Sequence, residues 1–237
     1  MAKLDGSKVV VIGGASGVGF AVAEAALAAG ADVVVGSSQT HRIEAAAGKL
    51  GRGAKGQTVD VKDEASVAAF FEAAGQFDHL VFTAGDWGAM TGPTRDLDVE
   101  ASKARMEVRF WGAARAAKYA IGQIAKNGSI TLTGGMLAHR PMPGAPLTTA
   151  SAHTTEGLAM GLARDLAPIR VNAVCLGLIL SEHVKTWGEP AIKGWTASLP
   201  LPRAGTVEEA AEAYLYLMRA TYVTGQVVRV DGGGSLV

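Results

Sequence analysis

A glycine-rich loop follows the first apolar run of the chain and constrains the fold more than any other feature. Residues 9–12 are apolar, residues 13–19 have the spacing G-x-x-x-G-x-G, and residues 20–29 are rich in alanine. This order predicts a strand, a tight turn and a helix. Such a turn brings backbone N–H groups and the N-terminus of a helix up to a diphosphate. Because both flanking patterns are present, the loop predicts a dinucleotide-binding fold.

Short apolar runs alternate with helical patterns along all 237 residues. The expected strands are 8–12, 32–35, 57–59, 79–83, 129–133, 170–174 and 227–230. The expected helices are 18–29, 40–49, 64–74, 99–124, 148–166 and 207–218. Because alternating strands and helices imply crossover connections, we expect a single doubly wound α/β domain of the Rossmann type over residues 1–237. Its seven-stranded, mainly parallel sheet would carry helices on both faces.

The composition excludes several classes of function. The 22 basic and 22 acidic residues give a formal net charge of zero, so no basic surplus is present to bind nucleic acid or an anionic membrane. No apolar run is long enough to span a bilayer, and no signal peptide is expected. The only cysteine, Cys175, argues against a disulfide framework and a cysteine-based metal site, and it fits a reducing cytoplasm. No histidine, aspartate or glutamate cluster has metal-ligand spacing, so no metal is expected.

The least regular stretch covers residues 181–205 and contains Trp187, Trp195 and three prolines. In doubly wound folds, ligands bind at the carboxyl ends of the strands. A late irregular segment there is interpreted as a substrate lid. The alternative is an apolar flap that packs against a partner subunit.

Several motifs in the same order resemble those of the short-chain dehydrogenase/reductase family, over nearly the whole chain. The matching motifs are Gly13, Gly17 and Gly19 of the loop, Asp60-Val61, Thr83-Ala84-Gly85, Arg170–Val174 with Gly177 and Ser181, Arg203-Ala204-Gly205, and residues 223–233. The chain departs from the family pattern at Ile12, where threonine is usual, and at Leu176, where proline is usual. The resemblance implies a nicotinamide dinucleotide cofactor and a small-molecule substrate. It also implies a homodimer or homotetramer that pairs through helices 99–124 and 148–166.

The residues after the second expected strand favour NADP over NAD. An acid at this point would bind the ribose 2′-hydroxyl and repel a 2′-phosphate, and none is present between residues 36 and 42. Ser37, Ser38 and Arg42 suit a phosphate instead. The alternative is an ordinary polar loop in which Thr40 caps the next helix. The expected cofactor residues are Gly13, Ser16, Gly17, Val18, Gly19, Ser37, Ser38, Arg42, Asp60, Val61, Ala84, Gly85, Gly177 and Ser181.

The family that this chain resembles uses a tyrosine, a lysine four residues later, a serine and an asparagine for catalysis. An ungapped alignment of residues 128–158 places Thr148 at the tyrosine, Ala152 at the lysine and Gly135 at the serine. Arg109 falls at the asparagine position. The alignment therefore implies that the family's four catalytic side chains are absent.

Three residues are candidates to replace these groups: Arg109, Thr148 and Thr133. Arg109 could clamp an anion or stabilise developing negative charge, or it could form an interface ion pair. The two threonines offer hydroxyls, or they serve only as a helix start and a strand residue. His139, Trp187 and Asp86 are expected near the substrate, with plain loop surface as the alternative for His139 and Asp86.

Three functions fit these observations. The first is an NADP-dependent oxidoreductase with a divergent mechanism. The second is an NADP-binding protein without turnover, acting as a sensor or partner subunit. The third is a non-redox enzyme, such as an isomerase or dehydratase. Gly177 and Ser181, which persist where the family holds the carboxamide of the cofactor, favour the first function.

Overall fold

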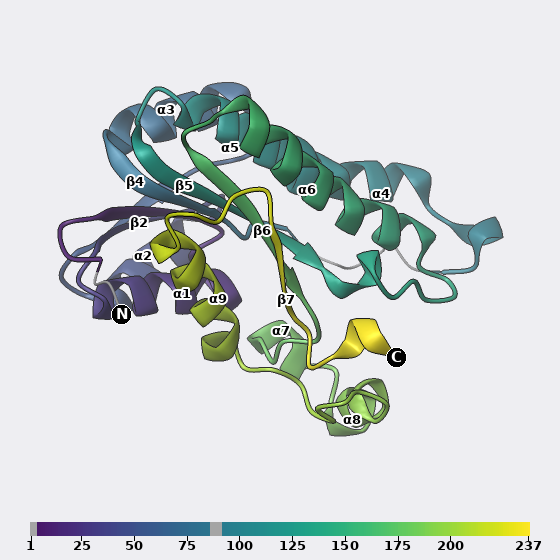
Figure 1. Cartoon of the computed structure of the whole chain (residues 1–237). Helices are drawn as coiled ribbons and strands as arrows, with labels where there is room; N and C mark the ends of the chain where they lie inside the picture. The colour runs from purple at the N-terminus through teal and green to yellow at the C-terminus, as the bar shows by residue number, and fades with distance from the viewer. Residues whose placement is uncertain (1–3, 86–91) are drawn as a thin grey trace.

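A seven-stranded sheet forms the centre of the computed structural model, which describes residues 4–85 and 92–237 (Figure 1). The strand order is β3-β2-β1-β4-β5-β6-β7, and all neighbouring pairs are parallel. The strands are β1 (Lys8–Ile12), β2 (Asp32–Ser37), β3 (Ala54–Thr58), β4 (Phe77–Phe82), β5 (Ile124–Gly135), β6 (Arg170–Leu176) and β7 (Val227–Val230). This arrangement confirms the expected doubly wound α/β domain.

Helices cover both faces of the sheet. They are α1 (Gly17–Ala28), α2 (Thr40–Leu50), α3 (Glu64–Ala74), α4 (Val99–Met106), α5 (Gly112–Ala120), α6 (Pro146–Asp165), α7 (Glu182–Lys185), α8 (Glu189–Thr196) and α9 (Val207–Arg219). Val9 and Val11 enter the core under α1 and α9, whereas Val10 and Ile12 enter the core under α3, α5 and α6. Successive side chains of a strand point to opposite faces, so one apolar strand serves both cores. No helix in the described ranges combines the length and the apolar character needed to cross a membrane.

The helix expected over residues 99–124 is confirmed as a continuous helical stretch as far as residue 120, but its expected end is wrong. The structure divides this stretch into α4, a π-helical turn η2 (Glu107–Trp111) and α5, after which a turn leads into β5. Ile124 is buried in β5 and pairs with Phe77 of β4. A buried apolar residue fits a helix and a strand equally well, so periodicity could not locate this boundary. The π-helical turn contains Arg109, and such turns are frequent at functional sites.

The sheet order reverses at β1, with β2 and β3 on one side and β4 to β7 on the other. β1 and β4 are neighbours at this reversal, and Ile12 lies opposite Phe82 where both strands end. In open parallel sheets, ligands bind outside the carboxyl ends of the strands at such a point. The loops after β1, β2 and β4 are therefore placed around one crevice.

The stretch 181–205 leaves the sheet after β6 and contains α7 and α8 (Figure 1). Its two ends are tied together, because Leu180 N donates to Gly205 O at 2.7 Å and Gly205 N donates to Leu178 O at 3.0 Å. Close to the C-terminal end of the segment, Leu201 N donates to Gly232 O at 3.0 Å, and Gly232 lies just before the C-terminal turn η4 (Gly234–Leu236). The segment therefore forms a loop whose two ends are hydrogen-bonded to each other near β6.

Candidate functional site

A cavity of about 990 Å³ opens at the carboxyl ends of β1, β2 and β4. Its walls include every expected cofactor residue except Gly177: Gly13, Ser16, Gly17, Val18, Gly19, Ser37, Ser38, Arg42, Asp60, Val61, Ala84, Gly85 and Ser181. These residues come from five separate stretches of the chain. The fold therefore brings the expected cofactor residues together around one space.

The glycine loop fits tightly between β1 and the loop after β4. Gly13 has a φ of 91°, and a Cβ at this position would lie 2.6 Å from Ala84 N. Gly17, with a φ of 54°, begins α1. The Ser16 side chain makes no capping hydrogen bond to the described residues of α1. The backbone of this turn and the N-terminus of α1 thus face the cavity without a side-chain cap, as a diphosphate site requires.

The end of the cavity next to β2 and β3 is polar and contains a cation. Ser37, Ser38 and Arg42 lie in its wall, as the sequence predicts for a 2′-phosphate. Asp60 closes the same end from the loop after β3, and its Oδ1 accepts a hydrogen bond from Lys62 N at 3.0 Å. Lys62 also lines the cavity, which sequence reasoning did not anticipate.

Gly177 lies outside the cavity lining, and packing explains why a glycine stands there. A Cβ at Gly177 would lie 2.6 Å from the Cα of Asp231. Ser181 does line the cavity, and its Oγ accepts a hydrogen bond from Val184 N at 3.3 Å at the start of α7. Of this pair, only Ser181 is placed to touch a ligand.

Arg109 is a buried cation in the cavity wall. It is 7% exposed and packs over Gly85, where a Cβ would lie 2.8 Å from its Cγ. Burial, and to a smaller extent the charge of Arg105, lowers the pKa of Arg109 to about 9, so the guanidinium remains charged at neutral pH. Arg105 lines the same cavity. The sequence did offer a signal for Arg105, because residues four apart share one face of a helix.

The two threonine candidates differ in position. Thr133 lines the cavity, but its Oγ1 donates to Phe82 O at 2.7 Å and lies 2.7 Å from Tyr214 Oη. Since the single Thr133 proton goes to the Phe82 carbonyl, Tyr214 is the donor in the second contact. Burial raises the pKa of Tyr214, which favours this protonated form. Thr148 is buried in the first turn of α6 and does not line the cavity.

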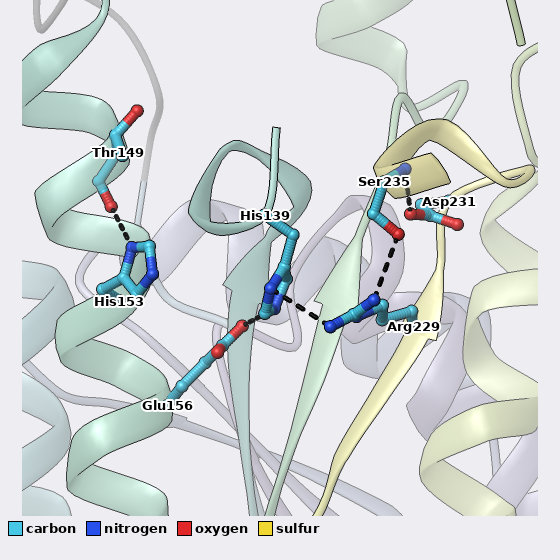
Figure 2. Close-up of polar contacts among 7 residues, drawn as sticks. All are labelled: His139, Thr149, His153, Glu156, Arg229, Asp231 and Ser235. Atoms are coloured by element: carbon cyan, nitrogen blue, oxygen red, sulfur yellow. Dashed lines mark hydrogen bonds and ion pairs between the residues drawn. The ribbon is translucent and has the colours of Figure 1, made fainter. Parts of the chain in front are cut away.

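Two of the three expected substrate residues, His139 and Trp187, do not line the cavity. His139 instead contacts Glu156 and Arg229, and none of the three lines the cavity (Figure 2). Trp187 is 42% exposed, and its ring centroid lies 6.2 Å from that of His183, which does line the cavity. Asp86 lies outside the described residues. The sequence analysis did not predict His183 at the cavity, because no sequence motif surrounds this histidine in the short helix α7.

A second, shallower cavity of about 390 Å³ lies on the outer surface of α4 and the start of α6. Val99, Met106, Trp111 and Leu147 contribute to its mainly apolar lining. Trp111 is 52% exposed although it is large and apolar. This surface belongs to the two helices through which the sequence predicts subunit pairing.

The chain matches known proteins over almost its full length. The sequence model of a family described as enoyl-(acyl carrier protein) reductase matches residues 13–235. The short-chain dehydrogenase/reductase ucsE of Acremonium sp is 35% identical, with 98% of this chain and 96% of that protein aligned.

Two solved structures of similar proteins bear on the cavity. One, a small-chain dehydrogenase in complex with NADPH, is 34% identical with a TM-score of 0.84, covering 98% of this chain and 100% of that one. The other, the MalC reductase/Diels-Alderase from Malbranchea aurantiaca, is 30% identical with a TM-score of 0.91, covering 99% of this chain and 98% of that one.

The fold, the order of the motifs and these matches agree with one another. Relatives above 30% identity extend over nearly the whole chain, and the family model covers more than nine tenths of it. The chain belongs to the short-chain dehydrogenase/reductase family, and it is an oxidoreductase-type protein of that family.

Proposed function

We propose that the protein is an NADP(H)-dependent oxidoreductase with a non-standard active site. The observation that carries this proposal is the convergence of the glycine loop, the Ser37–Arg42 side chains and Asp60 on one cavity. A relative of 34% identity was solved with NADPH, which supports the same cofactor here. When bound, the cofactor supplies or accepts a hydride; the protein positions it and excludes water.

The non-standard part of the proposal concerns the substrate end of the cavity. No tyrosine is found among the described residues that line it. Arg109 and Arg105 instead provide two positive charges in a partly enclosed space. A buried guanidinium is a poor proton donor, but it can stabilise an oxyanion where water is excluded. The proposed substrate therefore carries a carboxylate, enolate or similar oxyanion.

Loss of a general acid does not abolish hydride chemistry. General acid–base catalysis is worth about 10²–10⁴ in rate, or roughly 3–5 kcal/mol, whereas proximity and orientation supply roughly 7–11 kcal/mol. A cavity that holds the cofactor against the substrate therefore retains most of the possible acceleration. The stretch 181–205 is proposed as the lid that closes over the substrate, because its base is tied and α7 contributes to the cavity wall.

Titration of protein fluorescence with NADPH and NADH tests the cofactor assignment. Tighter binding of NADPH is expected, and tighter binding of NADH would refute the 2′-phosphate site. Cofactor oxidation is then measured against quinones, imines, enones and ketones, each with and without a carboxylate. Turnover restricted to the carboxylate forms supports the two-arginine site, and equal turnover of both forms argues against it.

A second candidate is a non-redox reaction, such as an isomerisation or ring closure, in the same cavity. One observation favours it: a solved relative with 30% identity and a TM-score of 0.91 is described as a reductase/Diels-Alderase. Product formation without net cofactor oxidation would distinguish this reaction from reduction. Tight NADPH binding with no turnover in either assay would indicate the sensor or partner-subunit role instead.

We also propose that the protein forms a homodimer or homotetramer in a cytoplasmic setting. The apolar surface around Val99 of α4 and Trp111 of η2 supports pairing through this helical stretch. Sedimentation at micromolar concentration should give a mass of two or four chains of 24.2 kDa each. A Trp111→Glu variant should shift the protein to monomer, whereas Tyr222→Glu, at another exposed aromatic position, should not.

A further inference from the structure

Three potential metal ligands from different elements meet outside the lining of the large cavity. His139 follows the turn η3 (Met136–Ala138), Glu156 lies on α6 and Cys175 lies on β6. One ligand atom from each residue lies within 4.8 Å of the other two. Spacing along the chain did not reveal this cluster, because 17 and 19 residues separate its members. It is also distinct from the residues that line the cavity.

The hydrogen bonds fix the state of the histidine ring (Figure 2). Arg229 Nη2 lies 3.2 Å from His139 Nδ1, and a guanidinium can only donate. Nδ1 is therefore the acceptor, and Nε2–H donates to Glu156 Oε1 at 2.8 Å. The ring is held with Nε2 toward the Glu156 carboxylate, and Nε2 is the nitrogen that a metal would take.

Without a bound metal ion, burial and the neighbouring negative charges disfavour the ionised form of the Cys175 thiol. Cys175 is 0% exposed and Glu156 is 6% exposed. Burial raises the pKa of the Cys175 thiol to about 12, and the negative charges of Glu156 and Asp231 act in the same direction. A bound dication reverses this balance, because it stabilises the thiolate and the carboxylate together.

We propose that His139, Glu156 and Cys175 form a binding site for one zinc-class transition-metal ion. The donor set of one imidazole nitrogen, one carboxylate oxygen and one thiolate sulfur is typical of zinc and unsuited to magnesium or calcium. With metal–ligand bonds of about 2.0–2.3 Å, the three atoms need to move by about an ångström, and water completes a tetrahedral site.

Binding has a defined proton balance. The thiol loses its proton to solvent, and the imidazole transfers its proton from Nε2 to Nδ1 through solvent, so one proton is released per ion. A protonated Nδ1 can no longer accept from Arg229. Arg229 is exposed at the surface and already lies 3.5 Å from Ser235 Oγ, so its guanidinium can turn toward Ser235 and Asp231.

The site would tie together elements that also form the cavity wall. Thr133 precedes η3 on β5, and Leu176 directly follows Cys175 on β6; both line the cavity. A metal ion that links η3, α6 and β6 should therefore stabilise the native state by mass action. The same ion should fix the loop that follows β5.

Titration of the full-length protein with Zn²⁺ and Co²⁺ tests this proposal. One equivalent of either metal is expected, with one proton released and a thiolate-to-cobalt charge-transfer band in the near ultraviolet. Cys175→Ser should abolish this band. His139→Asn and Glu156→Gln should each weaken metal binding more than about tenfold. His153→Asn is the matched control, because its ring lies 6.0 Å from that of His139 yet outside the cluster, and it should bind like the wild type.

Thermal melting provides a readout that does not depend on the absorption band. Zn²⁺ should raise the Tm of the wild type and of His153→Asn, and it should raise the Tm of Glu156→Gln by less at the same metal concentration. Cobalt binding without a thiolate band would overturn the proposal. Metal affinity equal to that of the wild type in both His139→Asn and Glu156→Gln would also overturn the proposal. This comparison tests the proposal even if Cys175→Ser fails to fold.

Discussion

The two ends of the large cavity are built in different ways. At the end proposed to hold the cofactor, the lining comes mostly from turns that directly follow strands, and much of it is backbone around Gly13 and Gly17. At the end proposed to hold the substrate, side chains from distant elements meet: Arg109 from the π-helical turn, Thr133 from β5 and His183 from α7. The first end is encoded by local motifs that resemble the family pattern. The second is assembled by tertiary packing, and there we propose that the chain departs from that pattern.

The largest expected effect is at the cofactor end. Gly13→Val should abolish binding of NADPH, because a Cβ would lie 2.6 Å from Ala84 N and the backbone φ is 91°. Backbone strain of this kind destabilises the native loop conformation by about 1–3 kcal/mol, and overpacking destabilises it by a similar amount. Isothermal titration measures the affinity, and circular dichroism verifies the fold.

Gly48→Ala is the matched control for that substitution. Gly48 lies inside α2, and the space that an alanine methyl group would occupy there is open. Alanine should therefore stabilise the protein by about 1 kcal/mol and leave NADPH binding unchanged. Wild-type affinity in Gly13→Val would show that the loop does not hold the diphosphate.

The next largest effect is at the substrate end. Arg109→Ala should lower kcat about 10²–10³-fold at saturating NADPH, which is the typical loss when one oxyanion donor is removed. Thr148→Ala should have a much smaller effect, because Thr148 does not line the cavity. Steady-state turnover of a carboxylate-bearing enone or ketone is the measurement. A dead Thr148→Ala enzyme with a normal Arg109→Ala enzyme would reverse the assignment.

A smaller effect is expected where the two cofactors differ. Arg42→Ala should weaken NADPH binding about tenfold or more, since a charge-assisted hydrogen bond is worth about 1.5–3 kcal/mol. The affinity for NADH should stay the same, because it has no 2′-phosphate. Arg52→Ala, an exposed arginine outside the cavity, is the control. Equal loss of both affinities would show that Arg42 acts through the loop and not on the phosphate.

The smallest effect concerns the scaffold that the two ends share. Thr133→Val should lower the free energy of unfolding by about 1–3 kcal/mol, because the buried Tyr214 hydroxyl loses its acceptor. Thr133→Ser keeps the hydroxyl and should lose less. Chemical denaturation gives the free energies. If Thr133→Val leaves stability unchanged but stops turnover, Thr133 is catalytic and not structural.

The accuracy of the predicted limits differs from element to element. The limits of α3 and β7 agree with the structure residue for residue, since each is bounded by a clear cap or turn. Asp63, for example, caps α3 by accepting from Ala65 N. The helix predicted over residues 99–124 ends at Ala120 in the structure, because the buried Ile124 of β5 fits a helical pattern as well as a strand, and its π-helical turn leaves no distinct periodic signal.

The sequence by itself determined the alternating α/β pattern, the glycine loop and the polar, acid-free segment after β2. Each of these depends on neighbouring residues, where conformational preference and spacing act locally. Only the tertiary structure decided that the helix face with Arg105 and Arg109 lines the large cavity, that Thr133 is held by Phe82 and Tyr214, and that His139, Glu156 and Cys175 meet. These contacts connect elements far apart in the chain, and their geometry depends on how helices and strands pack, which no local pattern encodes.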